Sequence, residues 1–270
     1  MTALPTLIEP AAWLLFLALG ATAGILAGLL GVGGGLVLVA ALAWLLPRQG
    51  IPPEAAMHAA LATSLASIVL TAMSSARAHA RRGSVLWPTV AWMVPGLLIG
   101  GWLGSRFAVG LDGRWLRWGV AGYCLLAAAQ MLLSRPKRAG DEMRVPRGAG
   151  MVAAGGGIGA VSALVGIGGG SMTVPLLSAL GVAPVRAVGT SSACGVFIGL
   201  ASALGYAMHA PAGALPQHAA GYVYLPAAIA VAAASILTAP LGTRIAHAIS
   251  GPALKRVFAL FLLAVGISLL

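Results

Sequence analysis

The chain has 270 residues, of which 60% are hydrophobic and 8% are charged, and its formal net charge is +11 at pH 7. Soluble domains average about 25% charged residues, so this composition excludes an ordinary soluble protein and indicates an integral membrane protein. The basic residues lie in short connections between apolar segments, where they orient spans, and we therefore expect no nucleic-acid partner.

The first ten residues contain Glu9 but no lysine or arginine. They lack the basic region of a secretory signal peptide, so we expect the first hydrophobic segment to be retained. The charge-free stretches that follow are each long enough for at least one membrane span of about 17 to 25 residues. They cover residues 10–47, 55–76, 83–105, 118–134, 148–185 and 187–243.

Two of these stretches are interrupted by glycine clusters, LLGVGGGLVL at 29–38 and LVGIGGGSMTV at 164–174. Glycine weakens a helix by roughly 1 kcal/mol relative to alanine, so each cluster predicts a helix break. Inside hydrocarbon such a break is costly unless the freed backbone groups face protein or a water-filled cavity. We therefore expect both breaks to line a site.

The two clusters belong to a longer internal repeat. They align at an offset of 135 residues, and ATSLAS at 62–67 aligns with GTSSAC at 189–194 at an offset of 127. The later part of each half aligns at a constant offset of 138: Gly83 with Gly221, Pro88 with Pro226, and GSR at 104–106 with GTR at 242–244.

We therefore predict an all-α polytopic membrane protein of two homologous halves, residues 1–133 and 149–270, joined by a basic linker at 134–148. In each half a glycine-broken segment, 11–46 or 149–180, precedes three spans. The expected spans are 55–76, 85–105 and 115–134 in the first half and 187–208, 222–243 and 252–270 in the second.

The distribution of loop charges bears on whether the broken segments cross the membrane. If each crosses once, the loop bases divide 8 to 8 between the two sides; if each enters, turns at the glycines and returns, they divide 12 to 4. The positive-inside rule favours the re-entrant hairpin, with the linker 134–148 on the cytoplasmic side of the membrane. A hairpin plus three spans makes the halves inverted repeats, as in many secondary transporters. Because the arm after each cluster is only about 16 Å long, eight true spans stay as the alternative.

The breaks also suggest a chemistry. A helix that restarts after glycines presents unpaired N–H groups and about half a positive charge, which favours an anion. Hydroxyls on the following spans can form a second wall without placing a full charge in the membrane. The alternative is close packing of small residues between helices. The candidate substrate-binding residues are Gly33, Gly34, Gly35, Thr63, Ser64, Gly168, Gly169, Gly170, Ser171, Thr190, Ser191 and Ser192.

Residues for catalysis or for metal binding do not form a recognisable pattern. The acidic residues lie in expected loops or at segment edges, the two cysteines have no CxxC spacing, and the histidines have no HExxH spacing and are expected at the membrane interface. We therefore predict no catalytic residue, metal site or cofactor, and a protein that is not an enzyme.

The motifs GILAGLLGVGGGLVLV and GAVSALVGIGGGSMTVPLL, followed by ATS or GTSS and then by GSR or GTR, resemble those of the TauE/SafE family of membrane permeases. The resemblance covers almost the full chain. It implies transport of small sulfur-containing anions, such as sulfite or organosulfonates, across the inner (cytoplasmic) membrane of a bacterial cell, without ATP hydrolysis. It also implies that both glycine clusters, with Thr63, Ser64, Thr190 and Ser191, frame the substrate path. Where the first half has Leu36, the second has Ser171, so we expect the second half to supply more polar contacts.

We therefore predict a secondary transporter, most simply an exporter, of a small sulfur-containing oxyanion. Export could be driven by the inside-negative membrane potential, about 2.3 kcal/mol per charge per 100 mV. The alternatives are a permease for a different small solute or ion, or a membrane scaffold that does not transport. The expected partners are the anion and the lipid bilayer, and a homodimer is left open.

Overall fold

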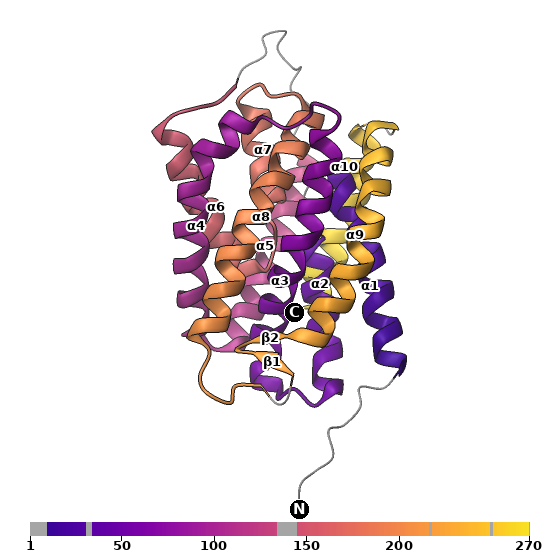
Figure 1. The fold of residues 1–270 in the computed structure, drawn as a ribbon, viewed down its shortest axis with the longest axis vertical. Helices are drawn as coiled ribbons and strands as arrows, with labels where there is room; N and C mark the ends of the chain where they lie inside the picture. The colour runs from indigo at the N-terminus through magenta and orange to yellow at the C-terminus, as the bar shows by residue number, and fades with distance from the viewer. Residues whose placement is uncertain (1–9, 31–33, 134–144, 216–217, 249–250, 270) are drawn as a thin grey trace, which may run out of the picture.

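The structure is a computed structural model that describes residues 10–30, 34–133, 145–215, 218–248 and 251–269. Within them it is almost entirely helical (Figure 1). The elements are α1 (Pro10–Leu30), α2 (Gly35–Leu45), the 3-10 helix η1 (Leu46–Gln49), α3 (Pro53–Ala80), α4 (Trp87–Val109), α5 (Gly113–Leu133), α6 (Ala149–Val165), α7 (Gly170–Ala179), α8 (Pro184–His209), β1 (Ala219–Ala220), β2 (Val223–Tyr224), α9 (Leu225–Ala248) and α10 (Gly251–Ser268).

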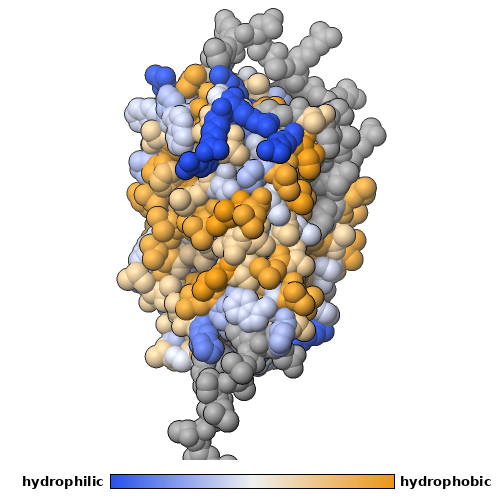
Figure 2. Space-filling model, turned by 45° about the vertical axis from the view of Figure 1, so that its right-hand side comes forward, coloured by the Kyte–Doolittle hydropathy of each residue, from blue (hydrophilic) through white to orange (hydrophobic). Residues whose placement is uncertain are grey.

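Length and hydropathy fit a polytopic membrane protein. Among the described residues, α1, α3, α8 and α9 are each long and apolar enough to cross a membrane. Figure 2 shows apolar side chains in a broad band around the middle of one face, with hydrophilic residues gathered above it and in smaller number below. The predicted all-α polytopic fold is confirmed.

Helices from the two halves of the chain are interleaved. The helices α3 and α8 pack against each other, α1 packs along α9, and α4 packs along α6. Glycines make these contacts close: a Cβ on Gly100 of α4 would lie 2.0 Å from the carbonyl oxygen of Gly156 on α6, and one on Gly28 of α1 would lie 1.9 Å from that of Ala239 on α9. Neither half therefore buries its helices alone.

Both glycine-broken segments turn back to the end from which they start (Figure 1). Near the start of α1, Phe16 packs edge-on against Tyr224, at the lower end in Figure 1, where η1 also ends. At the upper end, the hydroxyl of Thr89 on α4 donates to the carbonyl of Pro146, just before α6, and Val182, just after α7, lies in one apolar cluster with Leu86. This arrangement matches the hairpin interpretation and not the alternative of eight spans.

Two details differ from the expectations. A short antiparallel ribbon of β1 and β2 lies before α9, where the sequence predicted a span from residue 222. The histidines at the two ends of α3, His58 and His79, are buried rather than interfacial. Each presents Nε2 to backbone carbonyls of another element, His58 to Ala108 and Leu111 and His79 to Gly28. Polar pairing inside the protein therefore explains them better than contact with lipid headgroups.

Candidate substrate site at two helix breaks

The second glycine cluster forms a clean helix break. Helix α6 ends when Gly166 enters the left-handed region at φ 74°, and the N–H groups of Gly166 and Ile167 both donate to the carbonyl of Ser162. Helix α7 then begins after Gly169, also at φ 74°, whose carbonyl accepts from Met172 and Thr173. Two positive φ angles within four residues explain why this turn uses glycines.

The first cluster restarts a helix in the same way. Helix α2 begins at Gly35 after Gly34, which has φ 67° and accepts a hydrogen bond from the N–H of Leu38. The predicted helix restarts are thus confirmed, although each helix begins at the last glycine of its cluster, Gly35 or Gly170, and not after it. Gly33 lies outside the described residues.

The two breaks meet inside the protein. A Cβ on Gly35 would lie 2.4 Å from the carbonyl oxygen of Gly166 and 2.9 Å from Cα of Ile167. The hydroxyl of Ser64, on α3, lies 2.9 Å from that Gly166 oxygen and 3.2 Å from the Gly35 oxygen, so its single proton is shared between them. One predicted site residue therefore joins the two clusters, which lie in different halves of the chain.

Buried hydroxyls without a hydrogen-bond partner lie at the second break. The hydroxyls of Ser162, at the end of α6, and of Thr173, in the first turn of α7, are fully buried and have no partner among the described residues. The Ser162 hydroxyl would lie 3.4 Å from a Cβ on Gly169. Because buried polar groups are almost always paired, these two hydroxyls are suited to hydrogen-bond a bound solute.

A tyrosine that the sequence analysis missed also reaches this break. The hydroxyls of Tyr123, on α5, and Ser171, in the first turn of α7, lie 2.5 Å apart. No motif surrounds Tyr123, and helix α5 carries no glycine break, so only the three-dimensional packing could have placed it beside a predicted donor. Ser171 is thus already hydrogen-bonded, and a ligand would have to compete with Tyr123 for it.

The predicted threonines lie in a different environment. The Thr63 hydroxyl, on α3, accepts from the N–H of Tyr224 just before α9, and the Thr190 hydroxyl, on α8, accepts from the N–H of Leu86 just before α4. Both distances are 3.0 Å. Each threonine therefore anchors the start of a helix from the other half of the chain.

The last two predicted hydroxyls lie farther along α8. Ser192 bonds to the hydroxyl of Ser75 on α3, at 3.0 Å, and to the carbonyl of Val188. Ser191 is fully buried. Apart from Ser191 and the undescribed Gly33, the candidate residues divide into two groups. Gly34, Gly35, Ser64, Gly168, Gly169, Gly170 and Ser171 lie at the breaks, whereas Thr63, Thr190 and Ser192 tie helices together.

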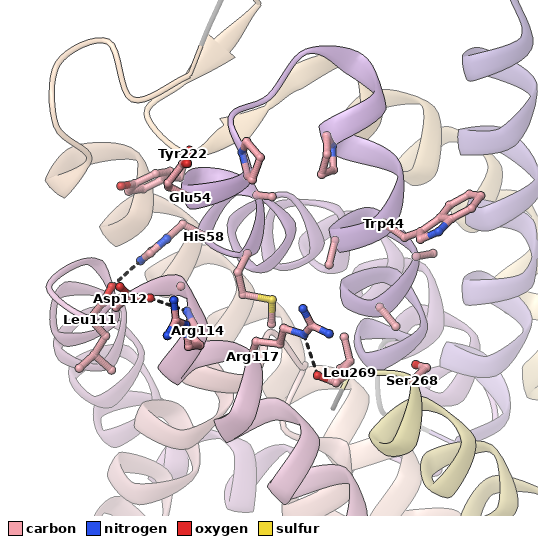
Figure 3. Close-up of a pocket in the computed structure, with 18 of the residues that line it drawn as sticks. Trp44, Glu54, His58, Leu111, Asp112, Arg114, Arg117, Tyr222, Ser268 and Leu269 are labelled. Carbon is pink, nitrogen blue, oxygen red and sulfur yellow. Dashed lines mark hydrogen bonds between the residues drawn. The ribbon is translucent and has the colours of Figure 1, made fainter.

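A pocket of about 1010 Å³ lies elsewhere, at the lower end of the molecule (Figure 3). None of the predicted site residues lines it. Its walls come from α2 and η1, the start of α3, the end of α4, the start of α5, the turn between β1 and β2, and the end of α10. Of the residues at the breaks all but the half-buried Ser171 are buried, so a solute reaches the buried ones only after the helices move.

The chain is similar over nearly its whole length to known membrane proteins. The family model described as "Sulfite exporter TauE/SafE" matches residues 16–269. A "Probable membrane transporter protein" from Haemophilus influenzae is 36% identical over 259 residues, covering 95% of this chain and 97% of that protein. A "Probable membrane transporter protein" from Xylella fastidiosa is 31% identical over 257 residues, covering 92% and 91%. No solved structure matches the chain significantly.

Proposed function

The chain belongs to the sulfite exporter TauE/SafE family, and on this basis we propose that it exports a small sulfur-containing oxyanion, sulfite or an organosulfonate, across the bacterial inner membrane. Membership of the family establishes a multi-pass membrane transporter. The substrate, the direction of transport and the cellular membrane are parts of the proposal.

The observation that carries the proposal is the meeting of two helix breaks in the protein interior, with unpartnered hydroxyls beside one of them. At the start of α7 the N–H groups of Gly170 and Ser171 precede the first backbone hydrogen bonds of the helix, which Met172 and Thr173 donate to the Gly169 carbonyl, and they lie at the positive end of the helix dipole. Ser162 and Thr173 add hydroxyl donors. An oxyanion can accept hydrogen bonds from both kinds of group, and glycines allow it to approach the backbone.

The same arrangement supports a mechanism of alternating access. We propose that residues 1–133 and 149–270 are inverted repeats, because one broken segment starts and ends at the lower end of the molecule and the other at the upper end. Each broken segment also packs against a helix of the other half. Rocking of one repeat against the other would expose the breaks to each side in turn. The connection between α3 and α4 and the starts of α6 and α8 lie at the upper end (Figure 1) and carry Arg81, Arg82, Arg147 and Arg186. We assign this end to the cytoplasm on the positive-inside rule.

Efflux from proteoliposomes tests this function. Purified protein is reconstituted into vesicles loaded with sulfite or methanesulfonate, and efflux is followed at imposed membrane potentials, with and without a pH gradient. We expect protein-dependent efflux that accelerates as the interior is made negative. Efflux no faster than from vesicles that are loaded with the same anion but contain no protein would contradict the proposed substrate. Efflux that requires a pH gradient at fixed potential would contradict a purely potential-driven exporter.

A further inference from the structure

The pocket at the lower end is lined by two arginines, Arg114 and Arg117. Arg114 and Arg117 are exposed, three residues apart on α5, and therefore on one face of that helix. Arg117 uses only Nε to hold the helix α10, donating to the carbonyl of Leu269 at 2.7 Å. Its terminal guanidinium nitrogens, and the whole guanidinium of Arg114, form no ion pair within the described residues.

The acidic residues of the lining have structural roles. A carboxylate oxygen of Asp112 accepts from the backbone N–H of Arg114 at 2.7 Å and so caps the start of α5. Glu54 lies in the first turn of α3, where a negative charge favours the helix dipole. The two acids thus stabilise helix starts, and the two guanidinium groups are left to face the pocket (Figure 3).

The rest of the lining is largely apolar. Ala40, Ala41, Ala43 and Trp44 contribute one wall from α2, and Met57 contributes from α3. Figure 3 shows Trp44 across the hollow from His58 and Tyr222, with Arg117 between the two sides and Arg114 below His58, beside Asp112. A volume of about 1010 Å³ matches the upper range of small-molecule sites and far exceeds what a sulfite ion would fill.

Tyr222 adds a neutral donor at the polar side. Its ring stacks on that of His58, with centroids 4.8 Å apart and planes 20° apart. Burial raises the pKa of Tyr222 above its ordinary value of 10, so the hydroxyl keeps its proton at physiological pH. A protonated hydroxyl can donate to an anion held by the arginines.

We propose that this pocket binds an amphiphilic anion, one with a compact anionic head held by Arg114 and Arg117 and an apolar body packed against α2 and Met57. It is distinct from the site at the helix breaks. Ala40 follows Gly35 by only five residues on α2, about 7.5 Å along the helix, so the pocket also forms the entrance at this end. Val39 and Leu61, whose side chains lie against Gly166 at the break, do not line the pocket. The entrance role rests on the proposed transport function; the binding does not.

Direct binding tests the proposal without any measurement of flux. Purified protein in phosphatidylcholine nanodiscs is titrated with p-toluenesulfonate and with its neutral analogue p-toluenesulfonamide by calorimetry. We expect the sulfonate to bind and the sulfonamide to bind at least tenfold more weakly. The variant Arg114→Gln/Arg117→Gln should weaken sulfonate binding at least tenfold. Arg106→Gln, at an exposed arginine of the same end that does not line the pocket, should leave it unchanged.

A second variant tests the pocket independently, in case the double arginine variant does not fold. Ala41→Phe fills the apolar wall and keeps both arginines, so it should also abolish binding while the thermal unfolding temperature changes little. The proposal is overturned if both pocket variants bind the sulfonate as the native protein does, or if Arg106→Gln weakens binding as much as they do. If the protein binds the sulfonate but shows no sulfite efflux, the proposed function is contradicted and the proposed pocket is supported.

The anionic head could belong to a free solute or to a lipid. Adding phosphatidylglycerol to the nanodiscs distinguishes the two sources. If the occupant is a lipid, phosphatidylglycerol should compete with the sulfonate, and native mass spectrometry should show a retained phosphatidylglycerol that Arg114→Gln/Arg117→Gln loses. If the occupant is a free solute, sulfonate affinity should not depend on phosphatidylglycerol. Either result supports an amphiphilic-anion pocket, and sulfonate binding without dependence on the arginines contradicts it.

Discussion

Among single residues, the types of residue at the breaks could be predicted from the sequence, but their partners could not. The clusters predicted backbone conformations that glycine allows, and Gly34, Gly166 and Gly169 indeed have positive φ. Ser64 and Thr63 are neighbours in one predicted hydroxyl wall. In the structure Ser64 bridges the two breaks, whereas Thr63 binds the backbone before α9. Which backbone group faces a hydroxyl depends on helix rotation, which sequence spacing leaves open.

Substitution by alanine should destabilise the protein far more at the glycine that ends α6 than at a turn glycine that also has a positive φ. Gly166 and Gly181 both have positive φ, but a Cβ on Gly166 would lie 2.4 Å from Val39 Cγ2, whereas a Cβ on Gly181 meets nothing within 4 Å. We expect Gly181→Ala to cost about 1–2 kcal/mol, the left-handed penalty alone. Gly166→Ala should cost about 1–3 kcal/mol more because of overpacking. Unfolding in mixed micelles measures both, and equal costs would contradict the packing described.

Among the helices, the long apolar segments could be predicted from the charge-free stretches of the sequence, but the ends of the helices and their packing partners could not. The sequence predicted a span at 222–243, and the helix α9 begins at Leu225 after a short β-ribbon. The two-residue strands carry no pattern by which a sequence could reveal them. Close pairing of α4 with α6, and of α1 with α9, arises between halves and depends on which glycine faces lie opposite one another.

The pairing of α4 with α6 predicts a contrast between two helical glycines. Gly100 faces the Gly156 carbonyl, at 2.0 Å from its would-be Cβ, while Gly119 on α5 has open space around it. Gly100→Ala must push the two helices apart, so we expect a clear loss of folded protein and a lower unfolding temperature. Gly119→Ala should be neutral or slightly stabilising, because alanine favours helix. Size-exclusion chromatography and thermal unfolding of both variants check this, and a well-folded, equally stable Gly100→Ala would refute the α4–α6 contact.

For the molecule as a whole, the distribution of basic residues among the loops distinguishes the two topologies from sequence alone. The hairpin interpretation, with bases divided 12 to 4, agrees with the way both broken segments return to their starting ends. The lower pocket could not be foreseen, because its lining comes from segments between residues 40 and 269 that share no motif.

Cysteine labelling measures this topology. In a background without Cys124 and Cys194, single cysteines replace Gln49, Arg82, Leu180 and Ala212 and are exposed to a membrane-impermeant maleimide in oriented vesicles. The hairpins predict that positions 82 and 180 share one side and positions 49 and 212 the other. Eight spans would place 82 opposite 180 and 49 opposite 212, so labelling in that pattern would refute the hairpins.

Binding of the substrate anion at the helix breaks can be tested through the unpartnered hydroxyls. Ser162→Ala and Thr173→Val remove buried groups that form no hydrogen bond among the described residues, so folding should be unharmed or slightly improved. Ser202→Ala removes a similar buried, unpartnered hydroxyl that instead faces Gly101 on α4. We would compare sulfite efflux from proteoliposomes for these variants and the native chain. We expect at least tenfold slower efflux for Ser162→Ala/Thr173→Val and native efflux for Ser202→Ala. Native efflux for the double variant would contradict anion binding at the breaks.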